Sequence, residues 1–253
     1  MRELDRNPSE LPHRCAIVGP GRLGHALAAA LRDAGIPAEG PLGRGEAPTD
    51  ANVVLLCVPD GEIARAAAAL RPATATHDAV SQFVGHCSGA TTLAPLHPHN
   101  AFSLHPLMTV PEGGTATFEG AGCAIAGSTP AALQVAEHLA HALRMHPVTV
   151  ADEDRAAYHA AASIAANFLV TLEGAAERLA ASAGVDRELL VPLARAALEN
   201  WAAKGAEQAL TGPVARGDEA TIARQRAAVE ERAPDLLPTF DALVAASRVV
   251  VAA

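Results

Sequence analysis

Aromatic side chains are scarce in this sequence, in which Phe, Trp and Tyr together make up 3% of 253 residues. Half of the residues are nevertheless apolar, so the core must be built from Ala, Leu and Val rather than from stacked rings. Positive charge is also in deficit, because 19 Lys and Arg stand against 28 Asp and Glu, which gives a net charge of −9. Non-specific nucleic-acid binding rests on clustered positive charge, so this balance excludes a general nucleic-acid-binding protein.

Long apolar runs and paired cysteines are missing as well. Apolar stretches such as Val53 to Val58 have the length of a strand and fall short of the roughly 18–20 residues that cross a bilayer. The N-terminal segment is polar and carries acids, unlike a secretory signal. No Cys-x-x-Cys pair occurs among the four cysteines, Cys15, Cys57, Cys87 and Cys123, a pattern that favours buried thiols in a reducing compartment. We therefore expect a cytoplasmic protein with no membrane partner.

The pattern of predicted secondary structure changes near Val150. After a polar lead-in over residues 1–12, short β-like runs alternate with helical runs, which predicts a mostly parallel sheet covered by helices. We predict an α/β domain over 13–150 followed by an all-helical domain over 151–253, in which the terminal Arg-Val-Val-Val alone resembles a strand. The predicted strands are 14–18, 37–44, 52–58, 79–85, 101–105, 122–126 and 147–150, and the helices are 22–34, 62–70, 130–143, 152–183, 187–204, 219–232 and 236–249. A helix as long as 152–183 favours a domain spine or a dimer interface.

The strongest local motif is a glycine-rich turn, Gly19-Pro20-Gly21-Arg22-Leu23-Gly24. It follows a predicted strand and opens a predicted helix, which is the context that gives a G-x-G-x-x-G pattern its meaning. Gly19 allows the tight turn, Gly21 lets the backbone approach a pyrophosphate, and Gly24 lets helix and strand pack closely. The helix N-terminus then offers unpaired N–H groups to the phosphates. The motif predicts a dinucleotide site.

The choice of dinucleotide depends on the end of the second predicted strand, where an acid would hold the adenosine ribose. The spacing reaches Arg44, and an arginine suits the 2′-phosphate of NADP(H), with Arg22 as a possible aid. Glu39 is the alternative: if the strand ends early, it becomes the ribose acceptor and favours NAD(H). NADP(H) is the preferred reading. Further weak cofactor contacts are expected where the next strand ends, at Val58, Pro59 and Asp60.

Several stretches together resemble a known protein family. They are Ala16–Gly24, Gly85–Gly89, Ser103–Leu107, Tyr158–Ala162 with Asn167, and Ala209–Asp218. The chain resembles Rossmann-like proteins with a C-terminal domain of unknown function 2520, which are related to pyrroline-5-carboxylate reductase and to 6-phosphogluconate dehydrogenase-like β-hydroxyacid dehydrogenases. The resemblance implies an N-terminal NADP-binding domain, a helical dimerisation domain and oxidoreductase activity. The family's Ser-Arg-Ser-like turn is Gly43-Arg44-Gly45 here, without the hydroxyls that would help to hold a 2′-phosphate.

Polar residues every four positions mark the first helix after the boundary. The stripe contains Arg155, His159, Ser163, Asn167 and Thr171. Related β-hydroxyacid dehydrogenases carry a Lys-x-x-x-Asn pair on this helix, and Ser163 and Asn167 keep its spacing without the lysine. His159 is therefore the candidate proton donor and Asn167 the polar anchor. Pairing of this stripe within the chain or across a dimer is the competing interpretation.

Other candidates lie at strand ends and in one loop. Ser88 and His105 follow strand-like runs, where they could bind substrate or merely cap turns. Thr211 and Arg216 offer donors to an anionic substrate or a partner subunit, and Asp218 is expected to cap the helix after it. The segment from His97 to His99 hints at zinc, but it contains no acid or cysteine, and we expect no metal.

These features together predict an NADP(H)-dependent oxidoreductase that reduces a small carbonyl or imine acid at the cleft between the domains of a homodimer. Two alternatives stay open. The missing lysine favours a non-catalytic NADP(H)-binding sensor, and the histidines would suit a metal-dependent hydrolase.

Overall fold

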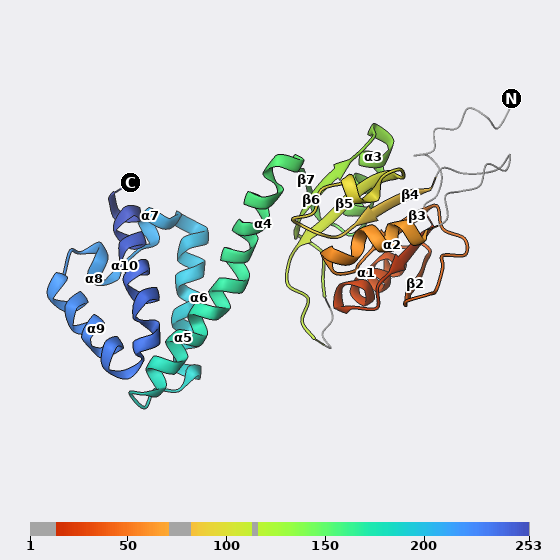
Figure 1. Cartoon of the computed structure of the whole chain (residues 1–253). Coiled ribbons are helices and arrows are strands. Elements are labelled where there is room, and N and C mark those ends of the chain that lie inside the picture. Colours follow the sequence, from red (N-terminus) through yellow and green to blue (C-terminus); the bar gives the residue numbers. More distant parts are fainter. Residues whose placement is uncertain (1–13, 71–81, 113–115, 253) are drawn as a thin grey trace, which may run out of the picture. The chain divides into compact units, whose positions relative to one another are not determined.

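The computed structural model describes residues 14–70, 82–112 and 116–252. The polar lead-in over 1–12 and the start of the strand predicted at 79–85 lie outside these residues. Contacts within the chain define two compact units, the first ending at Ser163 and the second beginning at Ile164 (Figure 1). The domain boundary between 150 and 151 remains a prediction. Within the described residues, no helix combines the length and apolar character that a membrane span needs.

The first unit is a seven-stranded sheet with the order β2-β1-β3-β4-β5-β6-β7. All neighbouring strands are parallel except β5 and β6, which are antiparallel. The strands are β1 (Cys15–Val18), β2 (Ala38–Leu42), β3 (Val53–Leu56), β4 (Phe83–His86), β5 (Asn100–Leu107), β6 (Gly122–Gly127) and β7 (His146–Thr149). This doubly covered, mostly parallel sheet confirms the predicted Rossmann-type fold class.

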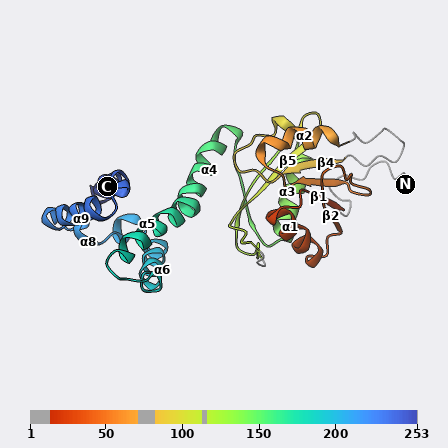
Figure 2. The ribbon, with the colours of Figure 1, turned by 60° about the horizontal axis from the view of Figure 1, so that its bottom comes forward.

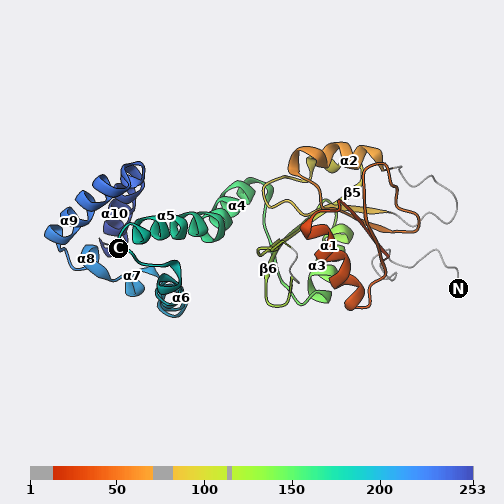
Figure 3. The ribbon, with the colours of Figure 1, turned by 90° about the horizontal axis from the view of Figure 1, so that it is seen from below.

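Helices cover both faces of the sheet. They are α1 (Arg22–Asp33), α2 (Ile63–Ala69) and α3 (Pro130–Ala142), and α1 and α3 lie on the face opposite α2 (Figure 3). Strand side chains alternate between the two faces, so Ile17 packs with α1 and α3 whereas Ala16 packs with α2. Because both faces are buried, β3 is a continuous apolar run, as expected of a central parallel strand.

The sheet order fixes where a ligand can bind. The chain leaves β1 for β2 on one side and returns to β3 on the other side of β1. In open α/β sheets, ligands bind at the carboxyl ends of strands where the order reverses in this way. That edge of the sheet carries the glycine-rich turn, which connects β1 to α1.

The second unit is helical and continues the helix that begins as α4 (Arg155–Ser163) through a π-helical turn, Ile164–Phe168. Its α-helices are α5 (Leu169–Ala181), α6 (Arg187–Lys204), α7 (Ala206–Ala209), α8 (Gly212–Ala215), α9 (Glu219–Arg232) and α10 (Leu237–Ala252). Figure 2 shows α5 and α6 side by side. Short 3-10 turns, Asp60–Glu62, Ala94–Leu96, Asp152–Asp154 and Pro234–Leu236, precede or connect elements of both units.

Two expectations for the helical part were wrong. The terminal Arg-Val-Val-Val is not a strand but belongs to α10, because its backbone hydrogen bonds continue the preceding helix. The segment with Thr211 and Arg216, expected to be a loop, is partly helical, because it contains the short helix α8, with Pro213 in its first turn. Asp218 does cap α9 as expected: its carboxylate accepts a hydrogen bond of 3.0 Å from the backbone N–H of Thr221.

Candidate functional site

The glycine-rich turn is shaped by backbone crowding on one side and open space on the other. Gly19 has φ +116°, and a methyl group there would lie 2.3 Å from the carbonyl oxygen of Cys57. A methyl group at Gly24 would lie 2.0 Å from the carbonyl oxygen of Gly19. Gly21, the N-terminal residue before α1, has nothing within 4 Å of its methyl position. The turn therefore closes tightly against β3 while Gly21 leaves room for a ligand at the helix N-terminus.

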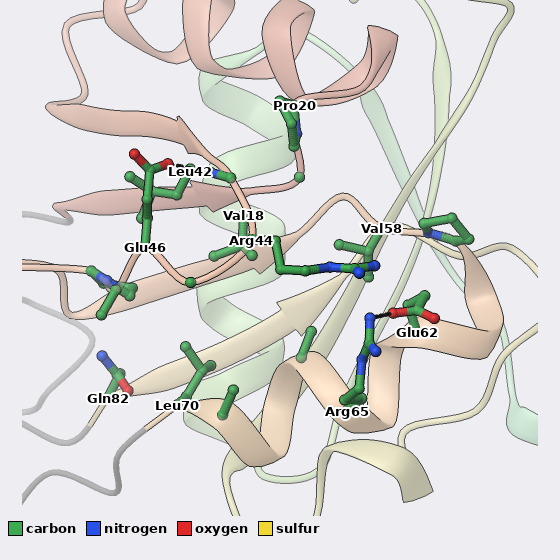
Figure 4. Close-up of a pocket in the computed structure, with 18 residues that line it drawn as sticks. Val18, Pro20, Leu42, Arg44, Glu46, Val58, Glu62, Arg65, Leu70 and Gln82 are labelled. Atoms are coloured by element: carbon green, nitrogen blue, oxygen red, sulfur yellow. Dashed lines mark hydrogen bonds and ion pairs between the residues drawn. The ribbon is translucent and has the colours of Figure 1, made fainter.

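A cavity of about 800 Å³ opens beside this turn (Figure 4). Its walls are the Gly19 turn, the loop after β2 and one side of α2. Arg44 enters it from the loop and Arg65 from α2, where Arg65 forms an ion pair with Glu62. Within the described residues Arg44 forms no hydrogen bond or ion pair. Its guanidinium is therefore available to an anionic group in this cavity.

Glu39, the alternative ribose acceptor, does not line this cavity. Its carboxylate accepts hydrogen bonds from the backbone N–H of Thr49, at 2.8 Å, and from the Thr49 hydroxyl, at 2.7 Å. Each of its oxygens therefore already has a partner, and binding a ribose would require those bonds to be replaced. The arrangement favours a ligand that meets Arg44 over one that meets Glu39.

A second cavity, of about 370 Å³, lies on the other side of Val58 and Pro59, which line both cavities. It extends from Gly21 and the start of α1 to Asp60 and Ser88. The predicted cofactor residues thus gather around two adjoining cavities: Gly19, Pro20 and Arg44 line the larger one, Gly21, Arg22, Leu23 and Asp60 the smaller, and Val58 and Pro59 both. Gly24 lies behind the turn, where it permits the close packing of α1.

The loop after β4 is held by its own polar side chains. The Ser88 hydroxyl donates a hydrogen bond to Asp60, at 2.9 Å, and accepts one each from the backbone N–H groups of Ala90 and Thr91. A hydroxyl has one donor and two acceptor sites, so these bonds use its full capacity. Contact between Ser88 and a substrate would have to replace one of them.

His86 holds the same loop through two hydrogen bonds to its backbone. Its ring is fully buried, with Nε2 3.0 Å from the carbonyl oxygen of Thr92 and Nδ1 3.2 Å from the backbone N–H of Ser88. Because the backbone N–H can only donate, Nδ1 accepts and Nε2–H donates. Burial lowers the pKa of His86, which keeps the ring in this neutral, doubly bonded form.

A cluster of three rings lies next to this loop. β5 extends beyond the end of β4 and carries His105, whose Nδ1 lies 2.9 Å from the hydroxyl of Tyr158 on α4. His159 packs edge-on against His105, with ring centroids 6.0 Å apart. A methyl group at Gly89 would lie 2.7 Å from His159 and 2.8 Å from His105, so only glycine lets both imidazoles close over the turn.

Arg155 is buried near this cluster, with 1% of its surface exposed. Its guanidinium donates to Asp152, at 3.0 Å, and to the Ser103 hydroxyl, while its third nitrogen, Nη1, has no partner within the described part of the chain. Its positive charge helps to lower the pKa of His86 and His105, after burial, which is the larger cause for both. Arg155 therefore acts on both histidines through its charge.

The remaining members of the predicted polar stripe lie further along the helix. Ser163 is half-buried, whereas Asn167 and Thr171 are exposed. Asn167 lies in the π-helical turn and its carbonyl oxygen accepts a hydrogen bond of 3.1 Å from the Thr171 hydroxyl. Thr211 and Arg216 are exposed in the second unit. The catalytic or binding roles predicted for Asn167, Thr211 and Arg216 remain predictions.

Acid should destabilise the protein through its buried imidazoles. Burial, the neighbouring His159 and Arg155 lower the pKa of His105 to about 4, while an unfolded chain protonates histidine near 6.5. The free energy of unfolding should therefore fall as the pH drops from 6.5 towards 4, by at most about 3 kcal/mol for this residue. Thermal unfolding of His105→Gln across this range should show a smaller pH dependence than the wild type. His25→Gln, at an exposed position on α1, should keep the wild-type pH dependence. If stability changed with pH as steeply in His105→Gln as in the wild type, that result would contradict a neutral His105.

Sequence reasoning missed two members of the site, Arg65 and Tyr158. Arg65 lies on the α2 helix, whose apolar side faces the sheet, and no local motif indicates that its other side borders a cavity. Tyr158 precedes His159 in the sequence. Its contact with His105 forms because β5 places His105 beyond the end of β4, where α4 passes. In the segment from His97 to His99, Nε2 of His99 lies 3.2 Å from the carbonyl oxygen of Ala67.

Residues 121–247, half of the chain, match the family described as Domain of unknown function (DUF2520). The chain belongs to this family. No functionally curated protein matches it in sequence.

Solved structures share its fold at low sequence identity. A candidate NADP oxidoreductase from Bacteroides fragilis is 16% identical, with TM-score 0.78 over 96% of this chain and 99% of that one. A protein from Thermotoga maritima is 24% identical, with TM-score 0.73 over 93% and 97%. A reductive aminase from Aspergillus terreus in complex with NADPH and ethyl-5-oxohexanoate is 16% identical, with TM-score 0.65 over 94% of each chain. At these identities the likeness shows the fold alone.

Proposed function

We propose that this protein is an NADP(H)-dependent oxidoreductase that reduces a small carbonyl or imine acid. The observation that carries the proposal is the pair of adjoining cavities on either side of Val58 and Pro59, one lined by Arg44 and the other extending to Asp60 and Ser88. Their combined extent and the shape of the Gly19–Gly24 turn suit an extended dinucleotide with a phosphate on its adenosine ribose. The NADPH complex of the similarly folded reductive aminase supports this choice of cofactor.

The protein's own groups would then divide the work. The Gly21 backbone and the N-terminus of α1 would hold the diphosphate, and Arg44 the 2′-phosphate. NADPH supplies a hydride when bound, so the protein must provide binding, orientation and a proton. His105 and His159 lie beside the Gly89 turn, adjacent to the smaller cavity, and are the groups proposed for the proton and for orienting the substrate. Ser88 would act mainly by holding the loop, since its hydrogen bonds are already used.

A non-catalytic sensor of NADP(H) is the second candidate function. The observation that favours it is Ser163, which stands four residues before Asn167 where related β-hydroxyacid dehydrogenases have lysine. Protein that binds NADPH tightly but oxidises it with no member of a broad panel of oxo acids and imines would support the sensor. Steady NADPH oxidation with any of them would exclude it. The link to pyrroline-5-carboxylate reductase and its relatives rests on resemblance.

Arg44→Ala tests the cofactor assignment. The variant should lose about 10- to 100-fold in affinity for NADPH, because a charge-assisted contact with phosphate is worth about 1.5–3 kcal/mol. Affinity for NADH should change little, because NADH lacks the 2′-phosphate. Fluorescence titration of both nucleotides measures the two dissociation constants, with Arg224→Ala, an exposed position on α9, as the control. Equal losses for the two nucleotides would argue that Arg44 does not meet the 2′-phosphate, and a wild type that binds neither would refute the proposed function.

We further propose that the protein is a homodimer that associates through its helical unit. Large apolar side chains are exposed on the π-helical turn and on α5, α6 and α10, namely Ile164, Phe168, Val170, Leu189, Val191, Leu193, Leu198, Trp201, Leu243, Val249 and Val251. Among the described residues of this unit, buried apolar side chains are few: Ile222, Val229 and Ala233. Exposed apolar surface on this scale is typical of an interface, and a second copy of the chain offers a matching surface.

A further inference from the structure

Tyr158 is the chain's single tyrosine, and its hydroxyl forms a hydrogen bond with His105. The phenol oxygen lies 2.9 Å from Nδ1 of His105, and the two rings meet edge to face with centroids 5.6 Å apart and planes at 86°. The contact joins α4 to the overhanging end of β5, so it links two elements that are distant in sequence. Such a contact fixes both the position of the His105 ring and the state of its nitrogen.

The direction of this hydrogen bond follows from the two groups that form it. Burial raises the pKa of Tyr158 to about 12, so the phenol keeps its proton at neutral pH. A phenol O–H is a stronger hydrogen-bond donor than an imidazole N–H, and an unprotonated ring nitrogen is a stronger acceptor than a phenol oxygen. The O–H therefore donates to Nδ1 of His105. A neutral imidazole that accepts at Nδ1 carries its hydrogen on Nε2.

The other side of the His105 ring faces the loop after β4. A methyl group at Gly89 would lie 2.9 Å from Nε2, so this nitrogen stands directly over the Gly89 backbone. Ser88, the residue before it, lines the smaller cavity. Within the described residues Nε2 has no hydrogen-bond partner, so its N–H is free to meet a ligand.

We propose that Tyr158 is a positioning residue that fixes His105 as its Nε2–H tautomer, so that His105 donates a hydrogen bond to the carbonyl oxygen of the substrate. A neutral imidazole polarises a carbonyl in this way without giving up its proton. A hydride from NADPH would add to the carbonyl carbon, the C=O electron pair would move to the oxygen, and that oxygen would take a proton from His159 in its imidazolium form, which would become a neutral imidazole. His105 keeps its proton throughout, because losing it would leave an imidazolate. The identity of the ligand rests on the proposed function, whereas the tautomer does not.

Nitrogen-15 NMR of the full-length protein, labelled at histidine and recorded at neutral pH without ligand, tests the tautomer. His105→Gln identifies the His105 signals by their absence. The wild type should show Nδ1 of His105 as a pyridine-like nitrogen and Nε2 as a pyrrole-like one. Tyr158→Phe should move the two shifts towards each other, because the second tautomer then becomes populated, whereas Ser163→Ala on the same helix should not. A proton on Nδ1 in the wild type, or unchanged shifts in Tyr158→Phe, would overturn the proposal.

A titration with NADPH separates this inference from the proposed function. Tyr158 lines neither cavity, so Tyr158→Phe should bind NADPH within about twofold of the wild type, a difference well under 1 kcal/mol. A large loss of NADPH affinity would show that Tyr158 supports the fold or the cofactor rather than His105, and would count against the inference. Wild-type protein that fails to bind NADPH would refute the oxidoreductase while leaving the tautomer result standing.

Discussion

Replacing Gly21 with alanine should abolish NADPH binding while leaving the protein folded. Gly21 has φ −81°, which any residue adopts, and nothing lies within 4 Å of the position that a methyl group would occupy. The free protein should therefore tolerate Gly21→Ala with an unchanged melting temperature. The same open space is where the backbone would approach the diphosphate, so the methyl group should displace the ligand. We expect at least about a 100-fold loss of affinity, or nearly 3 kcal/mol, by fluorescence titration.

Two further glycines make this experiment specific. Gly61 also has open space around its methyl position but lines neither cavity, so Gly61→Ala should retain both stability and NADPH binding. Gly19→Ala should lose both, because its φ of +116° and the Cys57 carbonyl 2.3 Å away force the turn to move. Normal NADPH binding by Gly21→Ala would mean that the turn does not hold a diphosphate.

The main elements of both units could be predicted from local sequence. The predicted bounds of α6 and α9 agree with the structure residue for residue, since Gly205 ends the first and Asp218 caps the second. The glycine-rich turn could be predicted equally well, because each of its three glycines is required for a different steric reason. Local signals of this kind depend on residues within a few positions of one another.

The parts that escaped prediction depend on pairing between distant segments. The antiparallel pairing of β5 with β6 is set by the whole sheet, and the contact of His105 with Tyr158 joins residues 53 positions apart in the sequence. No local sequence pattern at His105 or at Tyr158 predicts their contact. The hydrogen-bond capacity of Ser88 is a similar case, because its occupation by Asp60 and two backbone groups appears only when the loop after β4 is folded.

Leu193→Glu on α6 should convert the protein from a dimer to a monomer. Leu193 is 69% exposed in the single chain and lies one helical turn from Leu189, which is 70% exposed. In the proposed dimer both would be buried, and a carboxylate placed among them would lose its hydration without gaining a partner. Burying a leucine contributes about 1.5–3 kcal/mol per copy, and symmetry doubles the effect of each substitution. Light scattering after size exclusion should report half the wild-type mass.

Gln225→Glu is the control, because this exposed position lies on α9, which carries none of the exposed apolar side chains assigned to the interface. Gln225→Glu should remain dimeric. Loss of the dimer should also lower the stability of the helical unit, because few of its apolar side chains are buried within one chain. Thermal unfolding of Leu193→Glu should thus gain an early transition that the control lacks. A wild type of monomeric mass, with Leu193→Glu equally stable, would show that this apolar surface does not join two copies of the chain.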